Sequence, residues 1–184
     1  MSFIYWLRHF ISHNRIATSF ALGLIFILFS RPTTRSILIG APAIVLGEFF
    51  RILSSGYLEK NSSLSMSGPY SVTRNPMYIG NFLLGLGFAI IVNQPIILLL
   101  FLLLFAFIYQ ATVVEEEKRL QQSFGQEFSV YMSSVPRFFP KPWQWKSNGR
   151  SFNWSLVIKH REHITWFGIL GGILLLTVKM VLLG

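Results

Sequence analysis

The chain has 184 residues, of which 52% are hydrophobic and only 12% charged, and its mean hydropathy is +0.53. A soluble domain carries about a quarter charged residues, so the composition excludes a soluble enzyme and indicates an integral membrane protein of one domain. The absence of cysteine excludes disulfides, thiolate metal sites, iron–sulfur clusters and a cysteine nucleophile. In a membrane protein, the formal net charge of +9 points to cytoplasmic loops rather than to nucleic acid.

The N-terminal segment, "MSFIYWLRHFISHNR", lacks the basic start, unbroken apolar core and cleavage site of a secretory signal peptide. We expect a short helix at the membrane surface here, with Arg8, His9 and His13 directed toward water. A spanning helix needs about 20 mostly apolar residues. Five stretches are candidates for such spans, at approximately residues 16–30, 36–54, 76–92, 95–114 and 164–183.

The connections between these spans predict their arrangement. Only Asn93 and Gln94 separate the third span from the fourth, so the two should form an antiparallel hairpin. Gly85 and Gly87 in the third span are expected to permit close helix packing. Five spans place thirteen Lys and Arg residues on the side of the N-terminus and three on the other, which predicts a cytoplasmic N-terminus and an external C-terminus. The three residues are Arg31, Arg35 and Lys179.

The stretch "GPYSVTRNPMY" interrupts the apolar pattern just before the third span. Gly68 and Pro69 predict a turn, and Pro76 suits the first turn of a helix. A helix start presents free backbone N–H groups and a positive dipole end to an anion. Tyr70 and Tyr78 add aromatic faces and hydroxyls. The residue types alone are equally compatible with an interfacial turn whose tyrosines lie in the aromatic belt.

A second polar stretch, "EEEKRLQQSFGQEFSVYMSSVPRFFP", follows the fourth span. Leu120, Phe124, Phe128 and Tyr131 recur at helical spacing, which predicts an amphipathic surface helix. Glu115–Glu117 lie where the span leaves the bilayer. They are either a solvated charge run, or a partly desolvated site in which one carboxylate faces inward and pairs with a cationic ligand.

Other ionisable residues favour structural roles. Glu48 and Arg51 are three residues apart on one helix face, which favours an internal ion pair over a catalytic one. The four histidines form two close pairs without a third ligand, so no metal site is predicted; they are His9 and His13, and His160 and His163.

Three parts of the sequence follow one another in order: the stretch "LGEFFRILSSGYLEKNSSLSMSGPYSVTRNPMYIG", the hydrophobic hairpin and the glutamate-rich stretch. Together they resemble the isoprenylcysteine carboxyl methyltransferase family and its bacterial relatives. That family is akin to the membrane phospholipid N-methyltransferases. The resemblance covers roughly residues 46–140. It depends on the order of a G-P-Y turn, an R-x-P-x-Y helix start, a hairpin, a glutamate pair, F-G and V-P-R-F. It implies an all-α integral membrane fold with about five transmembrane helices. A cytoplasmic pocket for S-adenosylmethionine would lie between the connection of spans 2 and 3 and the segment after span 4.

The resemblance also implies roles for individual residues. Glu116 would bind the cofactor ammonium, and a catalytic part would comprise Asn75, Tyr78 and Arg137. Asn75 stands where the family often has histidine, and "YQATVV" stands where the prenylcysteine enzymes tend to have an arginine, which weakens a prenylcysteine substrate. The cofactor-binding residues implied are Leu64, Ser65, Tyr70, Asn75, Pro76, Met77, Tyr78, Glu116 and Glu117.

The sequence thus predicts a multi-pass membrane methyltransferase that uses S-adenosylmethionine on a lipophilic or lipidated acceptor from the bilayer. The alternatives are a phospholipid or amine N-methyltransferase, an inactive scaffold of the same fold, and a sterol-type reductase, which would need more arginines around its pocket. One membrane domain, 1–184, would comprise N-terminal spans (1–60), a cofactor-binding catalytic part (61–142), and an interfacial segment with the last span (143–184). No metal and no nucleic acid is expected.

Overall fold

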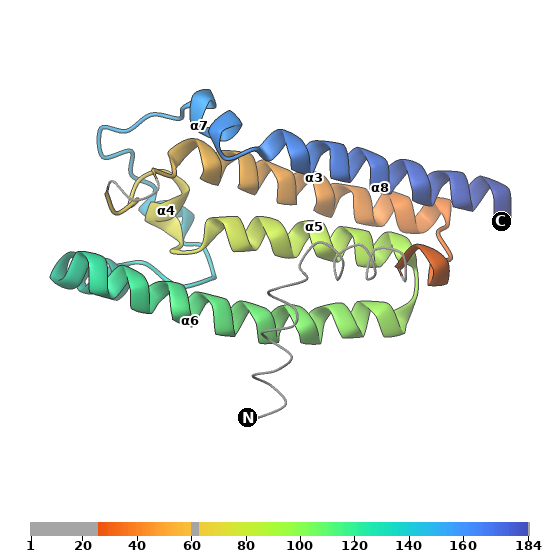
Figure 1. Ribbon diagram of the computed structural model, residues 1–184, viewed down its shortest axis with the longest axis horizontal. Coiled ribbons are helices and arrows are strands. Elements are labelled where there is room, and N and C mark those ends of the chain that lie inside the picture. The colour runs from red at the N-terminus through yellow and green to blue at the C-terminus, as the bar shows by residue number, and fades with distance from the viewer. Residues whose placement is uncertain (1–25, 60–62, 184) are drawn as a thin grey trace.

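The computed structural model describes residues 26–59 and 63–183, and every regular element in these ranges is helical. Four long helices lie side by side, and the short elements gather at one end of this bundle (Figure 1). The long helices are α3 (Thr34–Tyr57), α5 (Pro76–Val92), α6 (Pro95–Ser134) and α8 (Glu162–Leu183). The short elements are α4 (Pro69–Val72), the 3-10 helix η1 (Pro142–Gln144) and α7 (Trp154–Lys159).

Three of the long helices, α3, α6 and α8, are long and apolar enough to cross a membrane, and α5 is a shorter apolar helix. The all-α membrane fold is therefore confirmed, whereas the count of five spans is not. The expected surface helix lies outside the described residues, as does most of the first expected span. The predicted fourth span and the amphipathic helix after it are one helix, α6, interrupted at Gly125 by a backbone with φ of 49°.

Helices α3 and α5 approach closely because glycines face each other. A Cβ atom on Gly87 would lie 2.7 Å from the carbonyl oxygen of Gly40, and one on Gly47 would lie 2.8 Å from that of Gly80. The ring of Phe101 in α6 packs in the same way against Gly85. The predicted close packing at Gly85 and Gly87 is confirmed. Such contacts matter between membrane helices because lipid provides no hydrophobic force to drive the helices together.

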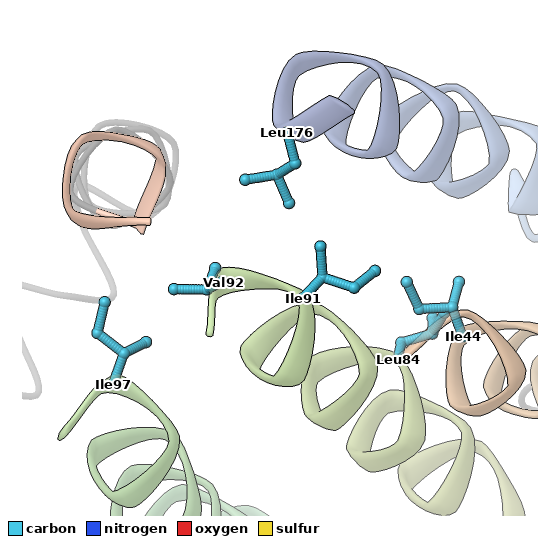
Figure 2. Close-up of a cluster of buried hydrophobic side chains, with 6 residues drawn as sticks. All are labelled: Ile44, Leu84, Ile91, Val92, Ile97 and Leu176. Atoms are coloured by element: carbon cyan, nitrogen blue, oxygen red, sulfur yellow. The ribbon is translucent and has the colours of Figure 1, made fainter. Parts of the chain in front are cut away.

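Two apolar clusters hold the opposite ends of the molecule. Figure 2 shows the first, to which α3, α5, α6 and α8 all contribute near the tight α5–α6 turn; its buried members are Ile44, Leu84, Ile91, Val92, Ile97 and Leu176. At the other end, Leu64 packs against Phe128, Tyr131 and Val135, and Leu120 and Phe124 add to this cluster. The helical spacing predicted for this stretch is therefore confirmed, and its apolar face covers the loop before α4.

Charged residues are also buried within the bundle. The predicted ion pair between Glu48 and Arg51 is present, with Oε2 and Nε 3.7 Å apart. Arg51 has a closer partner on α8, however, because its Nη2 atom lies 2.6 Å from Oε2 of Glu162. Sequence spacing could not identify this contact, which joins two helices far apart in the chain.

Candidate functional site

A cavity of about 760 Å³ opens at the end of the bundle where α3 ends and α5 begins. Its walls come from three parts of the chain: the segment after α3, the segment from Tyr70 to Asn81, and the stretch of α6 from Glu116 to Tyr131. The volume lies within the usual range for a small-molecule site. The cavity therefore joins the two polar stretches that stand apart in the sequence.

Most of the residues predicted for the site meet at this cavity. Asn75 and Tyr78, assigned to catalysis as well as binding, are on its wall, whereas Arg137 is not among the lining residues. The predicted cofactor-binding residues on the wall are Leu64, Ser65, Tyr70, Asn75, Pro76, Met77, Tyr78, Glu116 and Glu117.

The start of α5 is held in place by the segment that follows α6. The amide of Arg74 donates to the carbonyl oxygen of Pro136 at 2.8 Å, and Nδ2 of Asn75 donates to that of Arg137 at 3.0 Å. The hydroxyl of Thr73 also lies 3.3 Å from the carbonyl oxygen of Arg137. The Asn75 side chain therefore fastens the V-P-R segment to the wall of the cavity.

The N-terminus of α5 offers fewer free amides than the sequence suggested. Pro76 stands in the first turn, as predicted, and it has no N–H. The amides of Tyr78 and Ile79 both donate to the carbonyl oxygen of Asn75, at 3.1 and 3.3 Å. Within the described ranges, the amides of Asn75 and Met77 are left without a partner. An anion at this helix start would thus meet two donors rather than a full set of four.

The three consecutive glutamates have three different environments. Glu115 is exposed and is not part of the cavity wall. Glu117 is only 12% exposed and pairs with two arginines, Arg74 at 3.0 Å and Arg137 at 2.6 Å. Glu116 lines the cavity and accepts a hydrogen bond from the Tyr78 hydroxyl at 3.2 Å. Among the residues that the structure describes, Glu116 has no cationic partner, so its carboxylate remains available to a cation in the cavity.

Protonation states near the cavity follow from burial and charge. Burial raises the pKa of the Tyr70 phenol above its ordinary range, so this side chain stays neutral. The Tyr131 hydroxyl donates to the carbonyl oxygen of Tyr70 at 2.7 Å and fixes the end of α6 against α4. Hydrogen bonds with Glu117 raise the pKa of the Arg137 guanidinium, which stays charged.

Several wall residues lie outside the predicted set, and Asn81 is one of them. It follows Met77 by four positions and Tyr78 by three, so all three residues fall on one side of α5. Helical spacing counted from the R-x-P-x-Y helix start could therefore have identified Asn81. Glu59 and Arg119 also line the cavity and were not predicted.

Comparison with known proteins points to one family. The sequence model of the phospholipid methyltransferase family matches residues 17–127, which is more than half of the chain. The cobalt-zinc-cadmium resistance protein CzcN of Cupriavidus metallidurans is 30% identical over 141 residues, which cover 73% of this chain and 65% of that protein. The nickel-cobalt-cadmium resistance protein NccN of Alcaligenes xylosoxydans xylosoxydans is 33% identical over 82 residues, or 45% of this chain and 38% of that protein.

Both matched regions span less than two thirds of the relatives' own lengths, and both names refer to metal resistance rather than to a substrate. The family match agrees with the resemblance seen in the motifs, because both concern membrane methyltransferases. The chain therefore belongs to the phospholipid methyltransferase family.

Proposed function

We propose that this protein uses S-adenosylmethionine to methylate a lipophilic acceptor that reaches the cavity from the bilayer. The observation that carries the proposal is the position of Glu116. Of the three consecutive glutamates, it is the one that both lines the cavity and has no ion pair within the described ranges. A carboxylate in such a place favours a fixed positive partner.

The residues of the cavity fit the proposed methyl donor. Glu116 would hold its ammonium through a charge-assisted hydrogen bond. The unpartnered amides of Asn75 and Met77 would receive its carboxylate at the start of α5. Leu120 and Phe124 add apolar surface to the wall. When bound, S-adenosylmethionine supplies an electrophilic methyl group on a sulfonium.

The protein's own contribution would be positioning and exclusion of water. The rings of Tyr78 and Tyr109 lie edge to face at 5.5 Å, and Phe105 stacks on Tyr109 at 5.9 Å. Tyr78 lines the cavity, so this aromatic surface between α5 and α6 adjoins it. Holding two reactants together in a dry site can supply much of a methyl-transfer rate enhancement without an acid–base pair.

The orientation in the membrane belongs to the same proposal. The segments that line the cavity and the basic segment after α6 lie at the same end of the bundle, away from the α5–α6 turn (Figure 1). Since Lys and Arg accumulate on the cytoplasmic side, we propose that the cavity opens to the cytoplasm. A phospholipid is the second candidate acceptor, because the matched family carries that description.

Titration calorimetry of the purified, folded protein with S-adenosylmethionine and S-adenosylhomocysteine tests the proposal. Both compounds should bind, because the groups that we assign to the cavity meet parts that the two compounds share. Absence of heat at millimolar ligand, with retained helical circular dichroism, would reject the proposed function and favour an inactive scaffold.

A further inference from the structure

A chain of polar contacts crosses three helices and ends on the cavity wall at Asn81. Arg51 of α3 lies at its centre, and its Nη1 atom donates to Oδ1 of Asn81 on α5. The other terminal nitrogen donates to Glu162 at 2.6 Å and to the hydroxyl of Thr165 at 3.0 Å, both on α8. Glu48 lies 3.7 Å from Nε. The guanidinium is therefore held from two other helices.

These contacts fix which way the amide of Asn81 faces. A guanidinium can only donate hydrogen bonds, so the amide must turn its oxygen toward Arg51. The NH₂ group is then the free branch, and it has no partner among the residues that the structure describes. Because Asn81 lines the cavity, the wall carries an oriented N–H donor. The positive charge on the oxygen side polarises the amide and strengthens that donor.

The two carboxylates of this network do not face the cavity. Glu162 is 3% exposed, and its Oε1 atom accepts from the hydroxyl of Ser55 at 2.7 Å. Oε1 of Glu48 accepts from the indole N–H of Trp166 at 2.6 Å. Neither glutamate is among the lining residues. A molecule in the cavity therefore meets the amide donor rather than the negative charges behind it.

Along α5, the cavity wall changes its chemistry within one helical turn. The Tyr78 hydroxyl, nearer the helix start, donates to the carboxylate of Glu116. This part of the wall therefore suits a cation, which the carboxylate can bind. Asn81 lies three residues further along the helix, toward its apolar part, and offers a donor. An ammonium has no lone pair to accept this hydrogen bond, whereas a carboxylate or phosphate oxygen does.

We propose that Asn81 binds the polar head of the acceptor, and that this head presents an anionic oxygen rather than an ammonium. Carboxylate and phosphate heads share this chemistry. The inference rests on the proposed function, because it places the acceptor in the same cavity as the methyl donor. It also explains the role of the buried contacts of Arg51. They hold the guanidinium in place, and the guanidinium keeps the Asn81 amide from exchanging the positions of its oxygen and its NH₂ group.

The test uses three amphiphiles of equal chain length: dodecanoate, dodecyl phosphate and dodecylammonium. Each is titrated at pH 7.5 into the full chain in maltoside micelles with bound S-adenosylhomocysteine, and empty micelles serve as the blank. The wild type should bind at least one anion about tenfold more tightly than the ammonium, the effect of one charge-assisted hydrogen bond. The stronger of the two anions identifies the head group.

Asn81→Asp keeps the size of the side chain and an oxygen for Arg51, but replaces the donor with a second acceptor. It should abolish the preference for the anion, whereas Gln122→Asp, which adds the same charge to an exposed position of α6 outside the cavity wall, should leave it within about twofold. Should Asn81→Asp not fold, Asn81→Ala is the second variant, with weaker anion binding and unchanged ammonium binding.

Three results would overturn the inference: a wild type without anion preference, an Asn81 variant that retains it, or an equal loss in Gln122→Asp. S-adenosylhomocysteine affinity is measured in the same samples. If the wild type does not bind S-adenosylhomocysteine, the result counts against the proposed function. If both Asn81 variants bind S-adenosylhomocysteine normally and keep the wild-type head-group preference, the result counts only against the role of Asn81.

Discussion

The carboxylate of Glu117 receives two hydrogen bonds from the guanidinium of Arg137, at 2.6 and 3.1 Å. This contact ties the segment after α6 back to the middle of that helix. It also occupies the glutamate that adjoins Glu116 in the sequence, so neighbouring carboxylates take different roles. Both line the cavity, but Glu117 is paired with arginines, whereas Glu116 has no ion pair among the described residues.

Glu117→Gln should lower stability rather than remove a ligand contact. The substitution leaves Arg74, which is 13% exposed, without its carboxylate, and it weakens the tie to Arg137. We expect a loss of about 2 kcal/mol, below the roughly 3–5 kcal/mol for breaking a fully buried pair, because Arg137 is half exposed. Thermal unfolding in detergent measures the effect. An unchanged midpoint combined with a large loss of S-adenosylhomocysteine affinity would contradict this role.

Glu116→Gln should weaken S-adenosylhomocysteine binding about ten- to a hundredfold. The reason is the loss of a charge-assisted hydrogen bond worth about 1.5–3 kcal/mol. Glu115→Gln is the matched control, because this neighbouring side chain is exposed and outside the cavity wall. Calorimetry of the two variants, each checked for folding, provides the comparison. Equal small effects at both positions would mean that the triplet is only a charged helix end.

Gly87→Ala should force α3 and α5 apart. The added methyl would lie 2.7 Å from the carbonyl oxygen of Gly40 and 2.9 Å from the amide nitrogen of Ile44, and these backbone atoms cannot move away as a side chain could. Overpacking of this kind costs about 1–3 kcal/mol. Gly168→Ala on α8 is the control, because its methyl would meet no atom within 4 Å. A thermal midpoint lowered equally in both variants would argue against the predicted helix contact.

Single cysteines in this cysteine-free chain test the proposed orientation. Ser147→Cys lies in the basic segment after α6, and Gln94→Cys lies in the turn between α5 and α6, at opposite ends of the bundle (Figure 1). An impermeant thiol reagent should label the residue 94 variant in intact cells and the residue 147 variant only after lysis. The reverse pattern would place the cavity on the external side.

The sequence alone was sufficient for the membrane class, the α5–α6 hairpin and the packing role of Gly85 and Gly87. These features are local: they depend on composition, on short connections and on residues a few positions apart. The apolar spacing at Leu120, Phe124 and Phe128 likewise predicted an amphipathic helix, and the structure shows that its apolar side covers the loop before α4. The ordered motifs also predicted nine residues that the structure brings to one cavity wall.

Tertiary structure decided which partner each charged residue has. Three adjacent glutamates are alike as a sequence, but the arginines that reach Glu117 come from positions 74 and 137, and no local spacing brings both to it. The same holds for Arg51, where the predicted partner Glu48 is i–3, whereas the closer Glu162 comes from the last helix. Helical periodicity fixes which side of one helix a residue occupies. The pairing of charges, the cavity and the orientation of Asn81 depend on how separate helices meet, which only the packed bundle determines.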